Sequence, residues 1–286
     1  MRVAWIFPGQ GAEEPGMGLA FPRAASLLSI VERETGLDVR RAIERGGRAL
    51  GQTDVLQPSL VAVGWACAEA MKAAGLRADW CLGHSLGALS AAAWEAGLSA
   101  ERAIGLAATR GRAMRSCASE AGTMLAVRAS AEDVEAALTP GVCLAADNAP
   151  DEAVVSGDAA ALRRFASEIP WPSRPLRVSG AWHSPAMAPA VAPLREAALS
   201  AFDDARVADA LAEDLVRPVR FAPALGQLAD DGYTDLIFVA PGRVPFGLAR
   251  RTLGARLALH RVESPADVAA TVSRMGRAVD ADGRDP

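Results

Sequence analysis

A short apolar segment that runs directly into a glycine-framed serine is the feature that most constrains how this chain can fold. Residues 79–82 form a predicted buried strand, followed by Gly-His-Ser-Leu-Gly at 83–87 and a helix of small residues that ends near Gly97. The order strand, tight turn, helix fits the G-x-S-x-G nucleophile elbow, in which glycines let backbone segments approach closely and the serine hydroxyl is exposed. This segment predicts an α/β fold with Ser85 as a nucleophile; the alternative is a serine that only caps the helix.

A serine nucleophile needs a base, and the chain has three histidines. His84 neighbours Ser85 on the sharp turn, so its ring should point elsewhere and line the pocket or serve a structural role. His260 lies in an apolar, strand-like segment, which is typical of a structural histidine. His183 lies in the loop 180–185, and loops carry catalytic groups more often than strand interiors do. We therefore favour His183 as the general base.

Length and charge limit the class of protein. The chain has 286 residues, 51% of them hydrophobic, which suits one large domain with a smaller one inserted. A net charge of −4 gives no basic face of the kind that binds nucleic acid. Arginines do cluster locally, either as a solvated helix face or as a docking patch for an acidic partner or phosphates. These arginines are Arg243, Arg250, Arg251 and Arg256.

Cysteine spacing and hydropathy bear on the compartment. The four cysteines are far apart and form no C-x-x-C pair, which argues against a disulfide framework or a zinc site and favours the cytoplasm. The N-terminal apolar segment turns into Pro8-Gly9 too early for a signal peptide. The longest apolar stretch, residues 60–71, is too short to cross a bilayer. We expect no membrane association.

The middle of the chain has a different order of elements from the rest. Predicted strands and helices there alternate as βαββαβ, the ferredoxin-like unit. The strands are 123–129, 142–146, 153–156 and 173–178, and the helices start at Ser130 and span 159–169. We therefore place a small inserted subdomain at 122–179, with 1–121 and 180–286 forming the larger α/β subdomain. Within the larger part, single helices are predicted over 24–44, 185–201 and 208–215, among others.

Five separated motifs occur in the order found in one known family. They are Phe-Pro-Gly-Gln-Gly at 7–11, Gly-His-Ser-Leu-Gly at 83–87, Thr-Arg-Gly-Arg-Ala-Met at 109–114, Asn-Ala-Pro at 148–150 running on to Val-Val-Ser-Gly at 154–157, and Ala-Trp-His-Ser at 181–184. With these motifs the chain resembles the malonyl-CoA:acyl-carrier-protein transacylase family, which includes the acyltransferase domains of polyketide synthases. The resemblance spans nearly the whole chain.

The resemblance implies a fold, a reaction and a set of site residues. The fold would be a hydrolase-like α/β core with a parallel sheet and a ferredoxin-like insertion, with the active site between them. Ser85 and His183 would move an acyl group from coenzyme A to the phosphopantetheine thiol of an acyl carrier protein. No metal or redox cofactor would be needed, and we expect a monomer. The oxyanion hole would use the backbone amides of Gln10 and Leu86, and the substrate pocket would include Arg110, His84, Asn148 and Trp182.

Arg110 is the residue expected to select the acyl group. A guanidinium can hold a carboxylate through two parallel charged hydrogen bonds. In a semi-enclosed pocket this would favour malonyl over acetyl, whose methyl group would leave Arg110 desolvated and unpaired. Without the resemblance, the sequence would favour Arg110 as a surface residue on a helix.

The chain departs from the family at several positions. Trp182 stands where malonyl-specific members usually have Phe, and Ala88 replaces a common glutamate. The segment 200–209 is shorter than in the family. Asp214 falls where many members carry a glutamine whose backbone carbonyl orients the histidine. Asp214 could use the same carbonyl, or its carboxylate could hold the imidazole as in a Ser-His-Asp triad.

Four alternative functions stay open at this point. The same chemistry would serve the transacylase subunit of a malonate decarboxylase, or a trans-acting polyketide synthase acyltransferase that carries another acyl group. A serine hydrolase or editing thioesterase would use the chain order Ser85, then Asp214 or Asp235, then His260. A catalytically silent module that docks a carrier protein is the last alternative.

Overall fold

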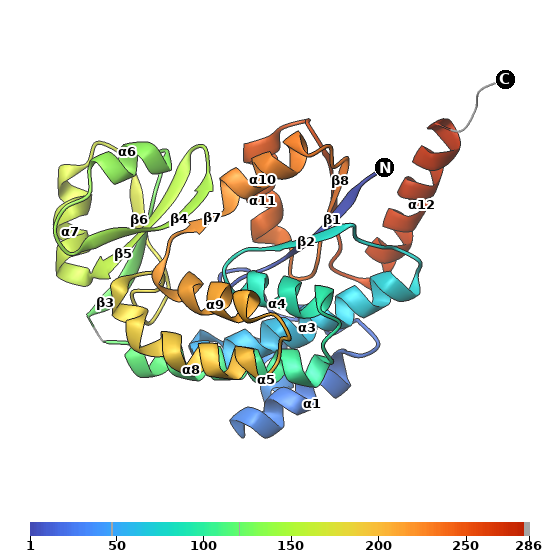
Figure 1. Cartoon of the computed structure of the whole chain (residues 1–286), viewed down its shortest axis with the longest axis horizontal. Helices are drawn as coiled ribbons and strands as arrows, with labels where there is room; N and C mark the ends of the chain where they lie inside the picture. Colours follow the sequence, from blue (N-terminus) through green and yellow to red (C-terminus); the bar gives the residue numbers. More distant parts are fainter. Residues whose placement is uncertain (47, 120, 283–286) are drawn as a thin grey trace.

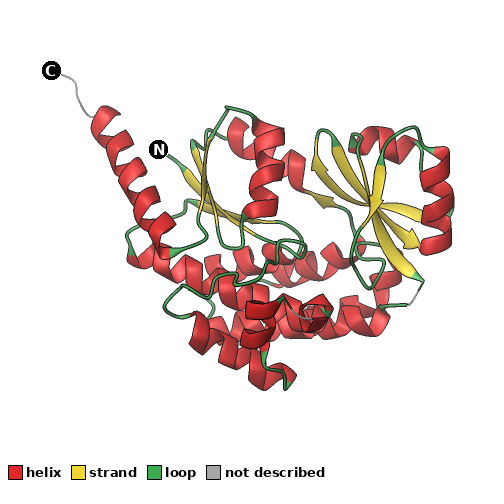
Figure 2. Ribbon diagram, turned by 180° about the vertical axis from the view of Figure 1, so that it is seen from behind, coloured by secondary structure: helices red, strands yellow, loops and turns green. Residues whose placement is uncertain are grey.

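Two separate sheets organise the computed structural model, which describes residues 1–46, 48–119 and 121–282 (Figures 1 and 2). In this described part, the first sheet has the strand order β2-β1-β8-β9 and is parallel throughout. Its strands are β1 (Val3–Phe7), β2 (Trp80–Gly83), β8 (Asp235–Phe238) and β9 (Ala258–Arg261). Every residue of β1 is buried, as a continuous apolar segment in a parallel sheet requires.

Helices pack around this parallel sheet. They are α1 (Ala24–Thr35), α2 (Val39–Arg45), α3 (Thr53–Ala73), α4 (Leu86–Glu95), α5 (Ala100–Cys117), α8 (Ala188–Leu199), α9 (Ala205–Glu213), α10 (Phe221–Asp230), α11 (Arg243–Leu253) and α12 (Pro265–Asp282). Short 3₁₀ turns occur at η1 (Arg48–Gly51), η2 (Pro185–Met187) and η3 (Asp214–Val216). Helix α3 is buried along most of its length and packs against α5 and α1. Among the described residues, no helix is both long and apolar enough to cross a membrane.

The second sheet confirms the ferredoxin-like prediction. Its strands β3 (Gly122–Val127), β4 (Val142–Ala149), β5 (Glu152–Asp158) and β6 (Ser173–Pro175) pair antiparallel in the order β6-β3-β5-β4. Helices α6 (Ala131–Ala136) and α7 (Ala159–Glu168) pack against them. Figure 1 shows this sheet and its two helices at the opposite side of the molecule from α12. The boundaries 122–179 stay our prediction for the small subdomain.

A fifth strand reaches the second sheet from outside that range. Strand β7 (Val219–Arg220) pairs parallel with β4, through Ala146 and Asp147. The sequence did not lead us to predict β7 or α10, because the segment 217–223 carries two prolines and no alternation of apolar and polar residues. This crossing segment ties the two sheets together beside the cleft described below.

Two predicted helices differ from the structure for local reasons. The helix predicted over 24–44 is two helices, because Gly36 adopts a left-handed conformation (φ 70°) that ends α1. The helix predicted over 185–201 begins as the 3₁₀ turn η2 before α8 starts. Strand β6 is also shorter than the predicted 173–178 and ends at Pro175, whose ring removes a backbone donor.

Candidate active site

Ser85 lies at the turn between β2 and α4, in a backbone conformation that side chains rarely adopt (φ 52°, ψ −113°). The glycines on either side permit this turn. A Cβ atom on Gly83 would collide with the backbone of Gly87, and one on Gly87 would collide with the carbonyl of Phe7. The turn therefore presents the Ser85 hydroxyl at the carboxyl end of the parallel sheet, as the sequence predicts.

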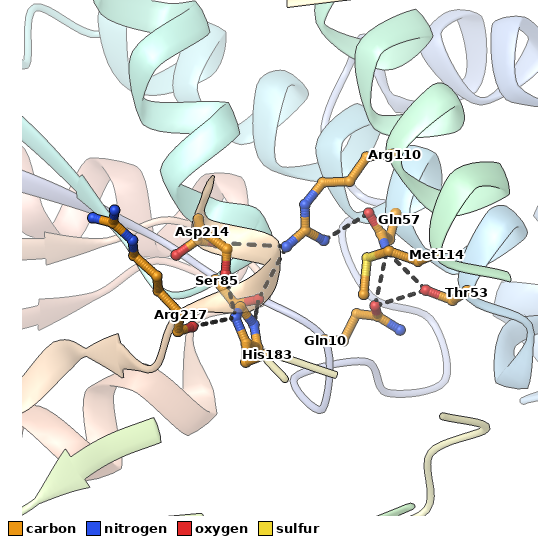
Figure 3. Close-up of polar contacts among 9 residues, drawn as sticks. All are labelled: Gln10, Thr53, Gln57, Ser85, Arg110, Met114, His183, Asp214 and Arg217. Carbon is orange, nitrogen blue, oxygen red and sulfur yellow. Dashed lines mark hydrogen bonds and ion pairs between the residues drawn. The ribbon is translucent and has the colours of Figure 1, made fainter. Parts of the chain in front are cut away.

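The ring of His183 reaches Ser85 from the loop before η2. Its Nε2 lies 2.7 Å from Ser85 Oγ, and its Nδ1 lies 2.8 Å from the carbonyl oxygen of Asp214 and 3.2 Å from that of Arg217 (Figure 3). A carbonyl oxygen only accepts hydrogen bonds, so Nδ1 carries the proton and Nε2 is left to accept the hydroxyl proton of Ser85. This is the geometry of a general base next to its nucleophile.

Burial keeps this histidine neutral. Loss of solvent lowers the pKa of His183 below its ordinary value of 6.5, and the Asp214 carboxylate opposes that shift. His183 is one of two non-glycine residues with a positive φ among the described residues, the other being Ser85. A neutral, fixed imidazole is the form that can take a proton at neutral pH.

Arg110 of α5 lies beside the serine and is almost completely buried, with 2% of its surface exposed. Its guanidinium donates to Gln57 Oε1 at 2.9 Å and lies 3.4 Å from Ser85 Oγ (Figure 3). The carboxylate of Asp214 lies 3.6 Å from the same guanidinium. Burial lowers the pKa of Arg110, and Asp214 opposes that shift. The structure therefore places a cation within reach of any acyl group on Ser85.

Asp214 settles one of the alternatives open in the sequence. It touches His183 through its backbone carbonyl, while its carboxylate faces Arg110. Of the two alternatives, the backbone carbonyl is the group that holds the imidazole, and the Ser-His-Asp arrangement does not occur at this residue.

The loop that carries Gln10 is held by its own side chain. Gln10 Oε1 accepts from Thr53 Oγ1 at 2.8 Å and from Gln57 Nε2 at 3.1 Å. Leu86 is the first residue of α4, where the backbone amide has no partner within the helix. Gln10 thus lies on a tethered loop and Leu86 at a helix N-terminus beside Ser85, positions suited to stabilise negative charge.

A cleft of about 620 Å³ opens over Ser85 between the two sheets. It is lined by Gln10 and His84, from the loops that follow β1 and β2 of the first sheet, and by Met124, Ala146 and Asn148 of the second sheet. The volume lies within the usual range for a small-molecule site. The cleft can therefore hold a substrate with its reactive carbon at Ser85.

His84, Asn148 and Trp182 all line this cleft. His84 Nε2 donates to Asn148 Oδ1 at 2.8 Å, and Asn148 Nδ2 donates to Glu152 at 3.2 Å. Burial lowers the pKa of His84, so this ring is a neutral structural donor. Trp182 is 5% exposed and precedes His183 in the chain.

The acyl transferase domain model matches residues 4–281. This chain belongs to the acyl transferase family. A malonyl CoA-acyl carrier protein transacylase of Synechocystis sp. is 31% identical over 277 residues, which cover 88% of this acyl transferase and 94% of the relative. A phenolphthiocerol synthesis type I polyketide synthase of Mycobacterium marinum is 34% identical over 275 residues. There the chain spans only 13% of the relative's length.

Solved structures agree with the fold of this acyl transferase. The crystal structure of the Synechocystis malonyl-CoA:ACP transacylase has a TM-score of 0.86 at 28% identity, covering 94% of this chain and all of the other. A type II polyketide synthase acyl carrier protein in complex with its malonyl transacylase includes a chain with a TM-score of 0.87 at 26% identity, covering 96% of this chain and all of the other. The hydrolase-like core with a ferredoxin-like subdomain is confirmed.

The hydrolase alternative, in which His260 is the base, does not fit the geometry of this acyl transferase. His260 Nε2 bonds the carboxylate of Asp235 at 2.7 Å. It lies on β9, and Ser85 follows β2 at the other edge of the sheet. Three strand spacings separate these strands, about 14 Å. Ser85 is in contact with His183 instead.

Sequence reasoning missed Gln57 and Thr53, which anchor both Arg110 and the Gln10 loop. The two residues are four apart on α3 and both are buried, with Gln57 Nε2 donating to Thr53 Oγ1 at 2.7 Å. Buried polar residues on an otherwise apolar helix were the available signal, since such groups must find partners. The carbonyl of Arg217 had no signal, because any residue could supply it.

The arginine cluster is mostly paired with carboxylates. Arg251 bonds Glu152 at 2.8 Å and Arg256 bonds Asp230 at 2.6 Å, while Arg243 lies 3.9 Å from Glu14. These contacts are compatible with a solvated helix face. A docking role for the cluster stays a prediction.

Proposed function

We propose that this acyl transferase moves a malonyl-type acyl group from coenzyme A to the phosphopantetheine thiol of an acyl carrier protein, through an ester on Ser85. The observation that carries the proposal is the 2.7 Å contact between Ser85 Oγ and an imidazole whose other nitrogen is held by two carbonyls. The similarity to malonyl CoA-acyl carrier protein transacylases supports the donor and the acceptor.

In the first half-reaction, His183 Nε2 takes the proton as Ser85 Oγ attacks the thioester carbonyl carbon. The oxygen of the tetrahedral intermediate gains a negative charge, which the backbone amides of Gln10 and Leu86 would stabilise. The carbon–sulfur bond then breaks. The imidazolium returns its proton to the departing coenzyme A thiolate, which leaves the acyl group on Ser85.

The second half-reaction reverses these roles. The carrier thiol gives its proton to His183 and attacks the acyl-serine carbonyl, and Ser85 recovers the proton as the ester breaks. Only protein groups take part, so we propose that no metal or redox cofactor is required. Water must be kept from the ester on Ser85, because otherwise the acyl group would be lost by hydrolysis.

Arg110 is proposed to bind the free carboxylate of the malonyl group. Its guanidinium is buried and lies 3.4 Å from Ser85 Oγ, within the length of a three-carbon acyl chain attached there. A charged, two-pronged contact of this kind recognises a carboxylate by shape as well as by charge. Trp182 is proposed to narrow the space beside the central carbon and so favour an unbranched acyl group. His84 and Asn148 are proposed to form the adjoining wall.

The same two half-reactions would serve fatty acid synthesis, polyketide synthesis or a malonate decarboxylase, each with its own carrier protein. We propose a cytoplasmic monomer. The four cysteines of the described residues are all free, which supports a reducing compartment.

Intact-mass analysis with a panel of acyl-CoAs tests the proposal. Malonyl-CoA should add one malonyl group to the wild-type protein and to the Ser200→Ala control, and none to Ser85→Ala. Adding a holo acyl carrier protein should move the group from the enzyme to the carrier. Failure of malonyl-CoA to modify Ser85, or rapid release of free malonate in place of transfer, would refute the proposed function.

A further inference from the structure

Asp214 makes two different contacts with the catalytic machinery. Its backbone carbonyl accepts from His183 Nδ1 at 2.8 Å, and its carboxylate lies 3.6 Å from the guanidinium of Arg110. Figure 3 shows Asp214 next to both His183 and the Arg110 guanidinium. The side chain can therefore change without removing the carbonyl that holds the imidazole.

The carboxylate of Asp214 is an internal counterion for Arg110. The guanidinium is 2% exposed, and a buried charge without a partner is strongly destabilising. Gln57 and Ser85 supply neutral acceptors only. Among the described residues, Asp214 supplies the carboxylate that forms an ion pair with Arg110.

The pair is loose enough to be displaced. Its 3.6 Å separation exceeds the 2.7–2.9 Å typical of a charge-assisted hydrogen bond. The Asp214 side chain is 26% exposed, so it can turn towards solvent when another carboxylate arrives. A substrate carboxylate and Asp214 would then compete for one guanidinium.

We propose that the Asp214 carboxylate sets how strongly the enzyme prefers a dicarboxylic acyl group over a neutral one, by occupying Arg110 when no substrate carboxylate is bound. This inference rests on the proposed function. With an acetyl group on Ser85, Arg110 keeps Asp214 as its partner, so the penalty that would reject acetyl is reduced. With a malonyl group, two carboxylates share one cation and repel each other. Both effects lower selectivity for malonyl.

Asp214→Asn tests this with little change in shape. The variant keeps the backbone carbonyl that bonds His183 but removes the negative charge. The measured quantity is kcat/KM for Ser85 acylation by malonyl-CoA divided by kcat/KM for acylation by acetyl-CoA. We expect this ratio to rise about tenfold or more, where each tenfold corresponds to a free-energy difference of about 1.4 kcal/mol. The rise should come from a faster malonyl reaction and a slower acetyl reaction. Asp214→Glu, which restores the charge, should return the ratio towards the wild-type value.

Asp209→Asn is the matched control. Asp209 lies on α9, is partly exposed, and pairs with Arg195, so its change should leave the ratio unaltered. Asp214→Ser provides a second neutral variant and should shift the ratio in the same direction as Asp214→Asn.

The possible results separate the two proposals. If wild-type Ser85 accepts no malonyl group, the proposed function fails. If wild-type Ser85 accepts malonyl, but the neutral variants leave the ratio unchanged or lower it, the role of Asp214 is refuted while the proposed function stands. An equal loss with both donors would mean that Asp214 only supports His183, and would also refute its role in selectivity.

Discussion

The buried residues His183 and His260 are held in opposite ways. His183 bonds the backbone carbonyls of Asp214 and Arg217 and contacts Ser85, whereas His260 bonds the carboxylate of Asp235. A histidine next to an aspartate is the arrangement expected of a catalytic triad. Here that pair lies within the parallel sheet, on neighbouring strands β9 and β8. Contact with the nucleophile, and not the chemical type of the histidine's partner, therefore identifies the base.

The largest effect should come from exchanging each histidine for alanine. His183→Ala removes the proton acceptor of Ser85, and we expect the rate of Ser85 acylation to fall by about 10³-fold. His260→Ala should leave that rate within about threefold of wild type, because its ring touches only Asp235 among the polar groups described. Single-turnover acylation with malonyl-CoA measures both. A larger loss with His260→Ala would reverse the assignment of the base.

The next effect concerns the aspartates, and here stability and activity should separate. Asp235→Asn weakens a buried hydrogen bond of a charged group, which contributes about 1.5–3 kcal/mol in proteins. We expect the free energy of unfolding to fall by about that amount and the acylation rate of the folded protein to be unchanged. Urea denaturation and single-turnover kinetics on the same sample check this. A lower rate without a loss of stability would show that Asp235 acts in the reaction.

The pH dependence of acylation sharpens the account of His183. Burial lowers the pKa of this ring below 6.5, so the base should stay deprotonated between pH 7 and pH 8. The acylation rate should therefore not change over that range. The rate should fall only at pH values below 6.5. Because the Asp214 carboxylate opposes the lowering, Asp214→Asn should move this fall to still lower pH. A fall centred above pH 6.5 would contradict the burial argument.

The smallest effect is expected near His260, at Glu263. Burial raises the pKa of Glu263 from 4.5 to about 7, so its ionisation opposes folding. The protonated form favours the folded state: this contribution is present at low pH and is lost as the pH rises through about 7. Glu263→Gln cannot ionise and keeps an acceptor for the Gly242 amide.

We therefore expect Glu263→Gln to raise Tm relative to wild type at pH 8, by less than about 3 °C, and to change it little at pH 4.5. Thermal unfolding followed by circular dichroism at the two pH values measures the difference. An equal change at both would show that packing and not ionisation is responsible. Acylation should be unaffected, because Glu263 lies outside the cleft.

Most of the fold could be predicted from the sequence because its signals are local. The apolar segment of β1 and the glycines around Ser85 fix a parallel sheet and its turn through short-range sterics. The order of strands and helices over 122–179 predicted the second sheet equally well. Strand β7 and α10 were not predicted, since a two-residue strand is defined by its partner β4 and not by its own residues.

The candidate site divides in the same way. Ser85, His183 and Arg110 belong to motifs, and the structure brings His183 and Arg110 each within hydrogen-bonding distance of Ser85. The groups that position them are harder to predict. The contacts of Asp214 depend on the fold of a segment far along the chain. Only the structure shows that its carbonyl contacts His183 and its carboxylate contacts Arg110.

The short strand β7 links the segment that holds His183 to the second sheet. The carbonyls that aim His183 lie at 214 and 217, and two residues later Val219 is fastened to Ala146 of the second sheet. Ser85, in contrast, is carried by the first sheet. A movement of the second sheet away from the first would consequently pull the imidazole of His183 away from the hydroxyl of Ser85. The distance between the base and the nucleophile thus depends on how the two sheets are placed against each other.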